Sequence, residues 1–507
     1  MNELLQTLRD CRDTLVKPVG DSIETARLQG RRQWFSIRWR IAPQDLLPGF
    51  MEARTEDSFF WQEPSHDIAI VGIGRAAALE ALGHDRFNIV AGSARDLFSN
   101  LQLHDLDPDH VLEAEAAWAD ARGPLLMGGF AFYGKETEGE IDLAIRSESE
   151  WRGLGAGRMI LPELCVVSSG SHAWVTRTCP VEPDDESGEI LERLCAGIPG
   201  MASGTSSDIL ADPGLTETAA AEEQEGSGPE IRVQADRAHA RYVAQVEAAL
   251  EAIDAGEFEK VVLARSLKVE AGQDFDLGSF LASLREIYPT CATLVVRKAD
   301  HWFISATPEL LVALDGDEVT TAALAGSAPR GRNPREEEEY SRQLFGSDKE
   351  RVEHDVVKSS ICAALATVCG SLECPDEPRL LKLEGIQHLE TPLRGRLLSQ
   401  SRGNVGILDL VAALHPTPAV GGAPSGPAVK WLEQHEALER GWFAGPVGYL
   451  DAQGNGEFRV ALRCALVRGK SARLFAGAGI VAGSEPQREL AETRLKLRAV
   501  LAPLTEI

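Results

Sequence analysis

The sequence contains no run of apolar residues that could cross a membrane. A membrane-spanning helix needs about 18 or more consecutive apolar residues, and no stretch of the 507 residues approaches that length. The first fifteen residues mix acids and bases and have no apolar segment of the kind found in secretory signals. We therefore expect a cytoplasmic protein with no membrane partner.

Positive charge is also scarce. The chain has 51 Lys and Arg residues against 78 Asp and Glu residues, which gives a formal net charge of -27. A surface with this excess repels phosphate backbones and anionic lipid, so nucleic acid is excluded as an expected partner. A site for a small anion must then supply its own cations or a metal ion.

The nine cysteines follow no paired pattern. They are odd in number, widely scattered and never spaced as C-x-x-C. In a cytoplasmic protein this usage is typical of free thiols rather than of a disulfide framework.

The composition divides the chain into three parts. Residues 1–180 alternate short β-like runs with helical stretches such as 94–118. Residues 181–229 are polar, small and acidic, which predicts a flexible insertion or linker at the surface. Residues 230–507 hold the segments whose chemistry is informative, and we expect them to form the catalytic region.

The pattern of the strands favours one fold class. Residues 235–256 are periodic like an amphipathic helix, and the β-branched run from Lys260 predicts a strand over 260–268. The predicted strands lack regular βαβ spacing. We therefore expect an α+β fold with large antiparallel sheets and surrounding helices rather than a doubly wound sheet.

Lys260 begins a strand that is expected to be covered on both sides. One interpretation is a lysine at the start of a strand whose ammonium group reaches solvent. The other is a lysine removed from water, which gives up its proton more readily and can act as a general base. The strand pattern alone leaves both open.

Glu309 follows Thr307 and Pro308 and stands between apolar neighbours. A carboxyl group in apolar surroundings can stay protonated and serve as an acid. The alternative is a carboxylate at the start of a helix, where the helix dipole stabilises it.

Two further helices are predicted from capping-box patterns that begin at Ser347 and Ser484. The first helix carries Glu350 and Glu353. The second carries three charged residues on one face, at Glu489, Glu492 and Lys496. Carboxylates from two facing helices can hold Mg²⁺ together with waters and an anionic ligand, and the alternative is a solvated acidic face.

Two glycine-rich loops, 325–331 and 476–480, can bring backbone amides close to an anion or can be ordinary turns. Arg463 ends the run 457–463, and strand alternation places it on one face with Glu457, Arg459 and Ala461 if the run has no bulge. An arginine in this apolar context suits bidentate binding of a carboxylate.

Together these segments resemble the chorismate-utilising enzyme family, and within it the members that form isochorismate. The matching stretches, in the same order, are FEKVVLARSLKV (258–269), ISATPELLV (304–312), TAALAGSAPRGR (321–332), SDKERVEHDVV (347–357), HLETPLRGRL (388–397), LHPTPAVGGAP (414–424), RGWFAGPVGYLDAQGNGEF (440–458) and AGAGIVAGSEPQRELAETRLK (476–496). FFWQEP (59–64) and RMILPEL (158–164) extend the resemblance into the N-terminal part.

The resemblance implies an anthranilate-synthase-like fold, Mg²⁺ as cofactor and chorismate as substrate. It also implies the role of each matching residue. Lys260 is the base that activates water for attack at ring carbon 2, and Glu309 is the acid that protonates the hydroxyl leaving carbon 4. The remaining implied roles are metal binding for Glu353 and Glu492, substrate binding for Arg463, Gly477, Gly479 and Lys496, and a second-shell position for Glu350, Glu489 and His388.

The residue at position 260 also distinguishes family members that use ammonia from those that use water. In family members that use ammonia, glutamine generally stands at this place, whereas a lysine fits a water nucleophile. We find no glutamine amidotransferase segment and expect no such partner subunit. The nearest rival is a salicylate synthase, which shares the lysine and goes on to eliminate pyruvate.

Other expectations depend on weaker features. The long N-terminal part favours the menaquinone branch over siderophore synthesis, and we expect a monomer. Phe443 stands where the family often has tyrosine in RGWYAGP, so one hydrogen bond to the substrate is in question.

Overall fold

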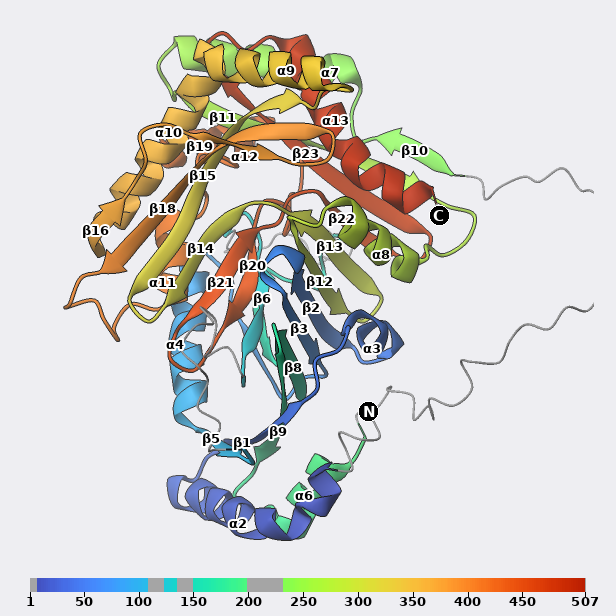
Figure 1. The fold of residues 1–507 in the computed structure, drawn as a ribbon, viewed down its shortest axis with the longest axis vertical. Coiled ribbons are helices and arrows are strands. Elements are labelled where there is room, and N and C mark those ends of the chain that lie inside the picture. The colour runs from blue at the N-terminus through green and yellow to red at the C-terminus, as the bar shows by residue number, and fades with distance from the viewer. Residues whose placement is uncertain (1–6, 108–122, 135–148, 198–230, 507) are drawn as a thin grey trace, which may run out of the picture.

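The computed structural model describes residues 7–107, 123–134, 149–197 and 231–506. Two large sheets with helices packed around them form this part of the chain (Figure 1). The helices are α2 (Arg12–Gln29), α3 (Leu47–Glu52), α4 (Arg86–Ser99), α6 (Ser187–Cys195), α7 (His239–Asp254), α8 (Leu277–Ile287), α9 (Pro334–Gly346), α10 (Asp348–Leu365), α11 (Ile407–Leu414), α12 (Ser425–His435) and α13 (Pro486–Thr505).

The larger sheet has 13 strands and is antiparallel apart from the parallel pair formed by its first strand in the sequence, β1, with β5. Its order is β10 (Arg232–Ala235), β11 (Lys260–Glu270), β23 (Ser471–Val481), β22 (Cys464–Arg468), β13 (His301–Thr307), β12 (Ala292–Lys298), β2 (Asp57–Glu63), β3 (Ile68–Ile73), β8 (Leu164–Ser169), β9 (His172–Val181), β1 (Gln33–Ile41) and β5 (Leu101–Asp105), with β19 (Gly422–Ala423) paired to β11.

The smaller sheet has 10 strands, and all of its pairs are antiparallel. Its order is β16 (Cys369–Glu373), β18 (Ile386–Leu397), β15 (Glu318–Pro329), β14 (Leu310–Asp315), β21 (Gly456–Val460), β20 (Pro446–Leu450), β6 (Leu126–Phe130), β7 (Gly157–Leu161) and β4 (Ala77–Glu80), with β17 (Arg379–Lys382) paired to β18.

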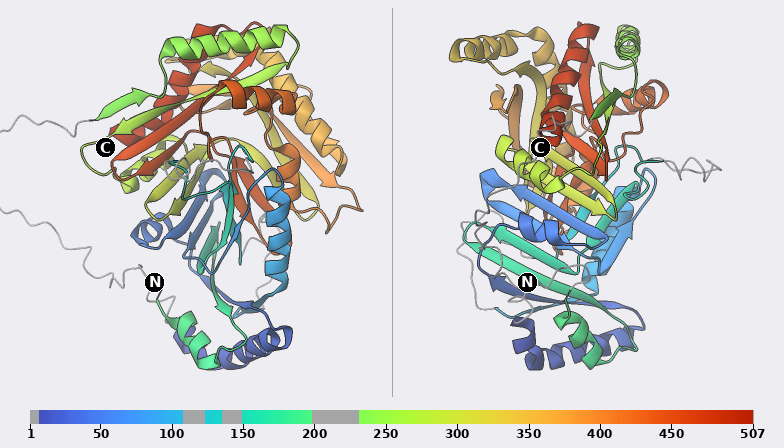
Figure 2. Two further views of the ribbon diagram at one scale, coloured as in Figure 1. Left: turned by 180° about the vertical axis from the view of Figure 1, so that it is seen from behind. Right: turned by 90° about the vertical axis from the view of Figure 1, so that its right-hand side faces the viewer.

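Both sheets contain strands from both ends of the chain. In the larger sheet β2 pairs with β12, and in the smaller sheet β6 pairs with β20. Figure 2 shows the early and late segments side by side in two further views. Helices and large, mostly antiparallel sheets confirm the expected α+β class.

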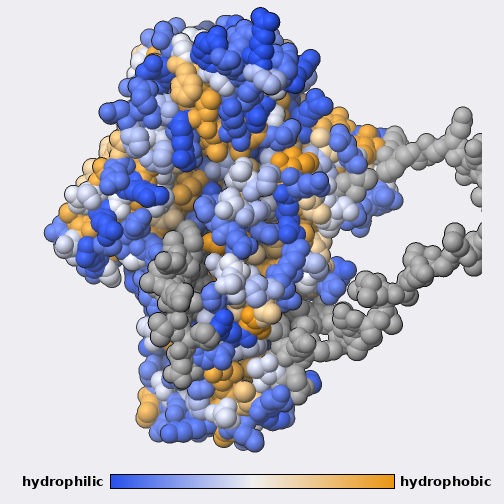
Figure 3. Space-filling model, viewed as in Figure 1, coloured by the Kyte–Doolittle hydropathy of each residue, from blue (hydrophilic) through white to orange (hydrophobic). Residues whose placement is uncertain are grey.

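The main apolar core lies between the sheets. Phe59 and Trp61 of β2 meet Phe130 of β6 and Phe458 of β21 in one buried cluster. On the face drawn in Figure 3, hydrophilic residues cover most of the described surface and apolar residues form small separate groups. Within the described ranges, no helix has the length and apolar character that a membrane crossing requires.

Local patterns predicted several elements. The amphipathic helix expected over 235–256 is α7, and the strand expected over 260–268 is β11. The helix expected over 94–118 is wrong in its extent, because α4 ends at Ser99 and 101–105 pairs with β1 as strand β5. Sheet pairing overrides local preference here.

The range predicted as an insertion, 181–229, begins with an ordered helix. The apolar face of α6 is buried through Ile190, Leu191 and Leu194, and α6 packs on α2. The rest of that range, from residue 198, lies outside the described residues, so the insertion stays a prediction there.

Candidate active site

Two neighbouring segments pass together from one sheet to the other. One leaves β13 of the larger sheet at Thr307 and enters β14 of the smaller sheet at Leu310, so Glu309 lies in the passage. The other leaves β21 and enters β22, and Arg463 lies in that passage. We call these two segments the paired crossover.

Hydrogen bonds join the two segments of the paired crossover. Val460 N donates to Glu309 O at 3.0 Å, and Ala306 N donates to Arg463 O at 3.2 Å. The Thr307 hydroxyl donates to Val460 O at 2.6 Å. The paired crossover therefore fixes the backbones of Glu309 and Arg463 relative to each other.

The backbone of Arg463 departs from the strand conformation. β21 ends at Val460, and Arg463 has a φ of 45°, which lies in the left-handed region. The conditional expectation that Arg463 shares a face with Glu457 and Arg459 therefore fails. Arg459 is instead held by Glu457 at 2.5 Å and Glu63 at 2.6 Å.

Helices α10 and α13 supply the predicted carboxylates. α10 begins at the predicted Ser347 cap, whose side chain accepts from Glu350 N. The cap predicted at Ser484 is wrong by one residue, because Glu485 is the N-cap of α13 and the Ser484 hydroxyl accepts from Val481 N at 3.2 Å.

A single cavity collects most of the predicted site residues. The cavity lies beside β23 and the paired crossover, and the empty space there is about 800 Å³ with adjoining open solvent included. The predicted residues that line the cavity are Glu309, Glu353, His388, Arg463, Gly477, Gly479, Glu492 and Lys496. The other three predicted residues, Lys260, Glu350 and Glu489, are not part of this lining.

Lys260 is fully buried and meets a lining carboxylate. Its ammonium nitrogen lies 3.0 Å from Glu353 Oε1. The solvent-reaching interpretation of Lys260 is therefore wrong. Burial works to raise the pKa of Glu353, but the positive charges of Lys260 and Lys349 outweigh it, so the pKa stays below the ordinary value.

The surroundings of Glu309 shift its pKa in the opposite direction from that of Glu353. Its side chain is buried, and removal from water raises the pKa of its carboxyl group to about 7, against a smaller lowering by Lys260 and Lys496. No helix begins at Glu309, since β14 follows directly, so the helix-start interpretation is wrong. Two of the carboxyl groups that line the cavity therefore differ, because the pKa of Glu353 is lowered and that of Glu309 is raised.

Cations gather at one side of the cavity. The guanidinium of Arg463 lies 3.3 Å from His388 Nε2, and Lys496 pairs with Glu492 at 2.7 Å and donates to Gly477 O at 3.0 Å. Burial and the charges of Arg463 and Lys496 lower the pKa of His388 well below its usual value, which keeps the imidazole neutral.

Gly479 permits close contact between a strand and a helix. A Cβ atom built on Gly479 would overlap Oε1 of Glu353 and approach Lys260. From Ala476 onward, β23 has β11 on one edge and no strand among the described residues on the other. On that second edge Gly477 O accepts from Lys496 and Val481 N donates to Ser484, and the other backbone groups of 476–481 there have no strand partner among the described residues.

Lys349 was not predicted from the sequence, and it organises the outer carboxylates. Its ammonium nitrogen lies 2.9 Å from Glu489 Oε1 and 3.2 Å from Glu350 Oε1. Glu350 also accepts from Ser327 N at 2.8 Å. Burial, with repulsion from Glu492, raises the pKa of Glu489 to about 7 although Lys349 lowers it. No local pattern pointed to Lys349, because its partner Glu489 lies on a different helix, α13.

Arg440 was also missed. It is fully buried, lines the cavity and pairs with Glu436 at 2.5 Å. Arg440 donates to Val262 O at 2.6 Å, and Glu436 accepts from Ala264 N at 2.8 Å. This pair fixes the edge of β11 two and four residues beyond Lys260. Phe443, in the same segment, stacks on Phe475 at 5.3 Å.

The acidic side chains around the cavity show whether this site could bind the expected Mg²⁺. No group of three His, Cys, Asp or Glu side chains in the described ranges converges on one point. Two carboxylates nevertheless line the cavity, Glu353 and Glu492, and each is paired with a lysine. Mg²⁺ is commonly bound by one or two carboxylates with waters and ligand anions completing the shell, so these residues fit it.

Several known proteins are similar to this chain in sequence or in fold. The family described as Chorismate binding enzyme matches residues 21–505. The isochorismate synthase MenF of Bacillus subtilis is 32% identical over 89% of this chain and 88% of its own length. The salicylate biosynthesis isochorismate synthase of Pseudomonas aeruginosa is 32% identical over 99% of this chain and 96% of its own.

A solved structure bears out the fold. MenF, the menaquinone-specific isochorismate synthase from Escherichia coli, superposes with a TM-score of 0.69 at 23% identity, over 96% of this chain and 100% of that one. The family match covers almost the whole chain, and the solved structure has the same fold. The chain belongs to the chorismate binding enzyme family.

Proposed function

We propose that this enzyme converts chorismate to isochorismate by adding water at ring carbon 2 and releasing the hydroxyl at carbon 4. One observation carries the proposal. A buried amine, Lys260, contacts the lining carboxylate Glu353 at 3.0 Å, and a buried carboxyl group whose pKa is about 7, Glu309, lines the same cavity. A reaction that removes a proton from water and returns one to a leaving hydroxyl needs such a base and such an acid.

Lys260 acts as the base and Glu309 as the acid. In this assignment the Lys260 amine, which lies 3.0 Å from Glu353 Oε1, takes a proton from water. With a pKa of about 7, Glu309 is partly protonated at neutral pH, and the protonated form can donate to the departing hydroxyl. Proton transfer of this kind contributes on the order of 10² to 10⁴ to a rate.

The cations of the cavity hold the substrate. Chorismate is a dianion, and Arg463 and Lys496 are lining cations that suit its carboxylates. Gly477 and Gly479 lie on the open edge of β23, where backbone N–H groups can add hydrogen bonds. Local positive charge overcomes the repulsion expected from a chain of net charge -27.

Mg²⁺ would be held by Glu353 and Glu492, with Glu350 and Glu489 as outer partners through water. When bound, it supplies positive charge that anchors and polarises a substrate carboxylate. Lys349 keeps Glu489 and Glu350 in place beside this position. His388, hydrogen-bonded to Ser327 at 3.0 Å, orients the guanidinium of Arg463.

Lys260 favours water over ammonia as the nucleophile, and no amidotransferase partner is needed. The second candidate is a salicylate synthase, which shares the lysine. We further propose a cytoplasmic monomer that serves the menaquinone branch. The relatives' names connect isochorismate formation with both menaquinone and salicylate.

The decisive assay incubates the purified protein with chorismate and Mg²⁺ and separates the products by chromatography. Isochorismate without salicylate is expected. Salicylate with pyruvate would identify the second candidate, and anthranilate formed on addition of ammonia would overturn the assignment of Lys260. Repeating the assay after metal chelation tests the Mg²⁺ requirement.

A further inference from the structure

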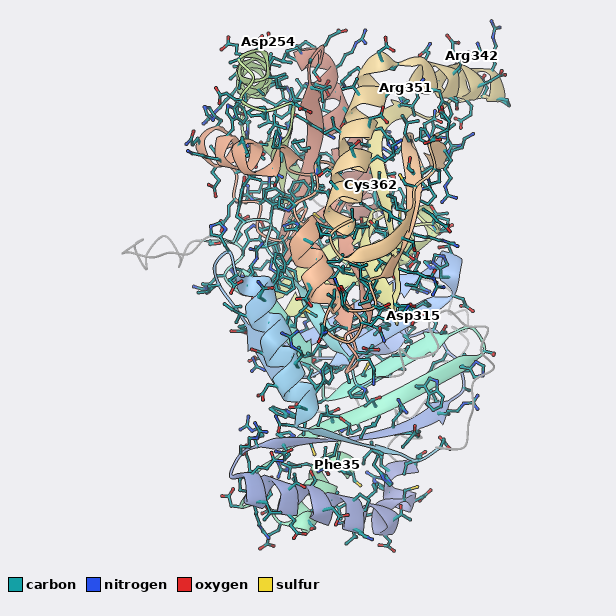
Figure 4. The ribbon with its side chains drawn as sticks, turned by 90° about the vertical axis from the view of Figure 1, so that its left-hand side faces the viewer. Phe35, Asp254, Asp315, Arg342, Arg351 and Cys362 are labelled. Carbon is teal, nitrogen blue, oxygen red and sulfur yellow. The ribbon has the colours of Figure 1, made fainter. Side chains whose placement is uncertain are left out.

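Two cysteines outside the cavity are in direct contact. Cys362 lies on α10 and Cys374 follows β16, and their sulfur atoms are 3.3 Å apart. Both thiols are free and half-buried. Figure 4 labels Cys362 on α10, at the outside of the molecule.

This pair differs from the other cysteines. Six of the nine are buried, and within the described ranges no second pair has its sulfurs in contact. Cys369 is close in sequence, but its sulfur packs against Gly395 of β18. Cys11 is half-buried without a neighbouring thiol among the described residues.

We propose that Cys362 and Cys374 are a reversible oxidation site, which closes to a disulfide when the protein meets a small-molecule disulfide such as oxidised glutathione. One thiolate attacks a sulfur of the reagent and releases one reagent thiol. The second cysteine then attacks the mixed disulfide and releases the other. The two cysteines lose two electrons and two protons, and the reagent disulfide is reduced to two thiols.

The surroundings favour closure by this pair. A disulfide needs the sulfurs at about 2.05 Å, so they must approach by little more than an ångström. Burial, together with the hydrogen bond to Cys374, raises the pKa of the Cys362 thiol to about 11. Cys362 is therefore a slow attacking group at neutral pH, and we expect Cys374 to react with the reagent first.

Closure would fasten α10 to an edge of the smaller sheet. β16 is the last strand of that sheet, and its neighbour is β18. Since the sulfurs are already 3.3 Å apart, we expect closure to need only a small local shift, which leaves Glu350 and Glu353 near the other end of α10 in place. The oxidised protein should keep its activity and gain thermal stability.

The experiment treats the full chain with oxidised glutathione and blocks the remaining thiols with iodoacetamide. Reduction and a heavy alkylating label then mark the oxidised positions. Residues 359–379 form one tryptic peptide that contains Cys362, Cys369 and Cys374, so fragmentation of this peptide assigns the label. The variants are Cys362→Ser, Cys374→Ser and, as a matched control, Cys369→Ala.

We expect heavy label on Cys362 and Cys374 together, no retained glutathione, and a rise in Tm of about 3 °C on oxidation. Both serine variants should lose the Tm rise, and Cys369→Ala should keep it. Label on Cys369 in place of either cysteine, a glutathione adduct that persists on Cys374, or nine unreacted thiols would each overturn the proposal.

Discussion

The ammonium nitrogen of Lys260 lies 3.0 Å from Oε1 of Glu353, with both side chains buried. The contact joins β11 of the larger sheet to α10. A buried pair of this kind contributes little net stability while it is intact, but removal of one partner leaves an uncompensated charge. Substitutions at either residue must therefore be judged by both activity and stability.

Lys260→Gln removes the proposed base and keeps much of the side-chain volume. Turnover should fall by about 10² to 10⁴, while chorismate binding stays within a few-fold in calorimetry. Lys268→Gln, on the same strand but paired with Glu270 at 2.8 Å, is the matched control and should keep full activity. Near-normal turnover of Lys260→Gln would remove the assignment of the base.

Glu309 predicts a falling limb in the pH dependence of kcat/KM. Its pKa of about 7 means that the acid loses its proton as the pH rises through neutrality, so kcat/KM should decrease above about pH 7. Glu309→Gln should cripple turnover at every pH. A flat profile from pH 6 to 9 would indicate that another group is the acid.

The same shift predicts how stability changes with pH in the metal-free protein. The pKa of Glu309 is 4.5 in the unfolded reference and about 7 in the folded chain, so the folded state binds more protons between these values. The stabilisation that protonated Glu309 gives to the folded state is fully present below about pH 4.5 and is lost as the pH rises to about 7. Relative to Glu309→Gln, the wild type should lose about 3 kcal/mol over that window, measured by urea unfolding, whereas exposed Glu259→Gln should show no such trend.

Glu353→Gln should raise the Mg²⁺ concentration needed for half-maximal activity at least tenfold, because it removes a carboxylate from the proposed metal site. Asp355→Asn, on the same helix with a largely exposed side chain, is the control. An unchanged Mg²⁺ titration for Glu353→Gln would contradict the metal assignment.

Lys349→Met removes the cation between Glu350 and Glu489. The metal-free protein should lose on the order of 3 kcal/mol of stability, since buried carboxylates lose their counter-charge, and Mg²⁺ should restore part of the loss. Thermal unfolding with and without Mg²⁺ measures both effects. A loss that Mg²⁺ leaves unchanged would show that Lys349 has a structural role apart from the metal site.

Gly479→Ala should displace the carboxylate of Glu353, because a Cβ atom at this position would overlap Oε1. We expect a fall in activity of at least about 10², together with a higher Mg²⁺ requirement. Gly426→Ala on α12, where nothing lies within 4 Å of the added atom, serves as the control and should behave as wild type.

The sequence predicted those parts of the site that depend on local pattern. The strand from Lys260, the helix over 239–254 and the placement of Glu353 and Glu492 on two helices follow from periodicity and capping. The position of Arg463 could not be predicted in this way, because the paired crossover breaks strand alternation. Lys349 and Arg440 acquire their importance from partners on other elements, which no local pattern reveals.

The paired crossover has a mechanical consequence. Its two segments are fastened to each other by backbone and hydroxyl hydrogen bonds, so Glu309 and Arg463 form one rigid unit at the seam of the sheets. α10 packs on β15 of the smaller sheet and α13 packs on β23 of the larger sheet. A tilt of one sheet against the other would therefore alter the distance between Glu353 and Glu492, while the spacing between Glu309 and Arg463 is preserved.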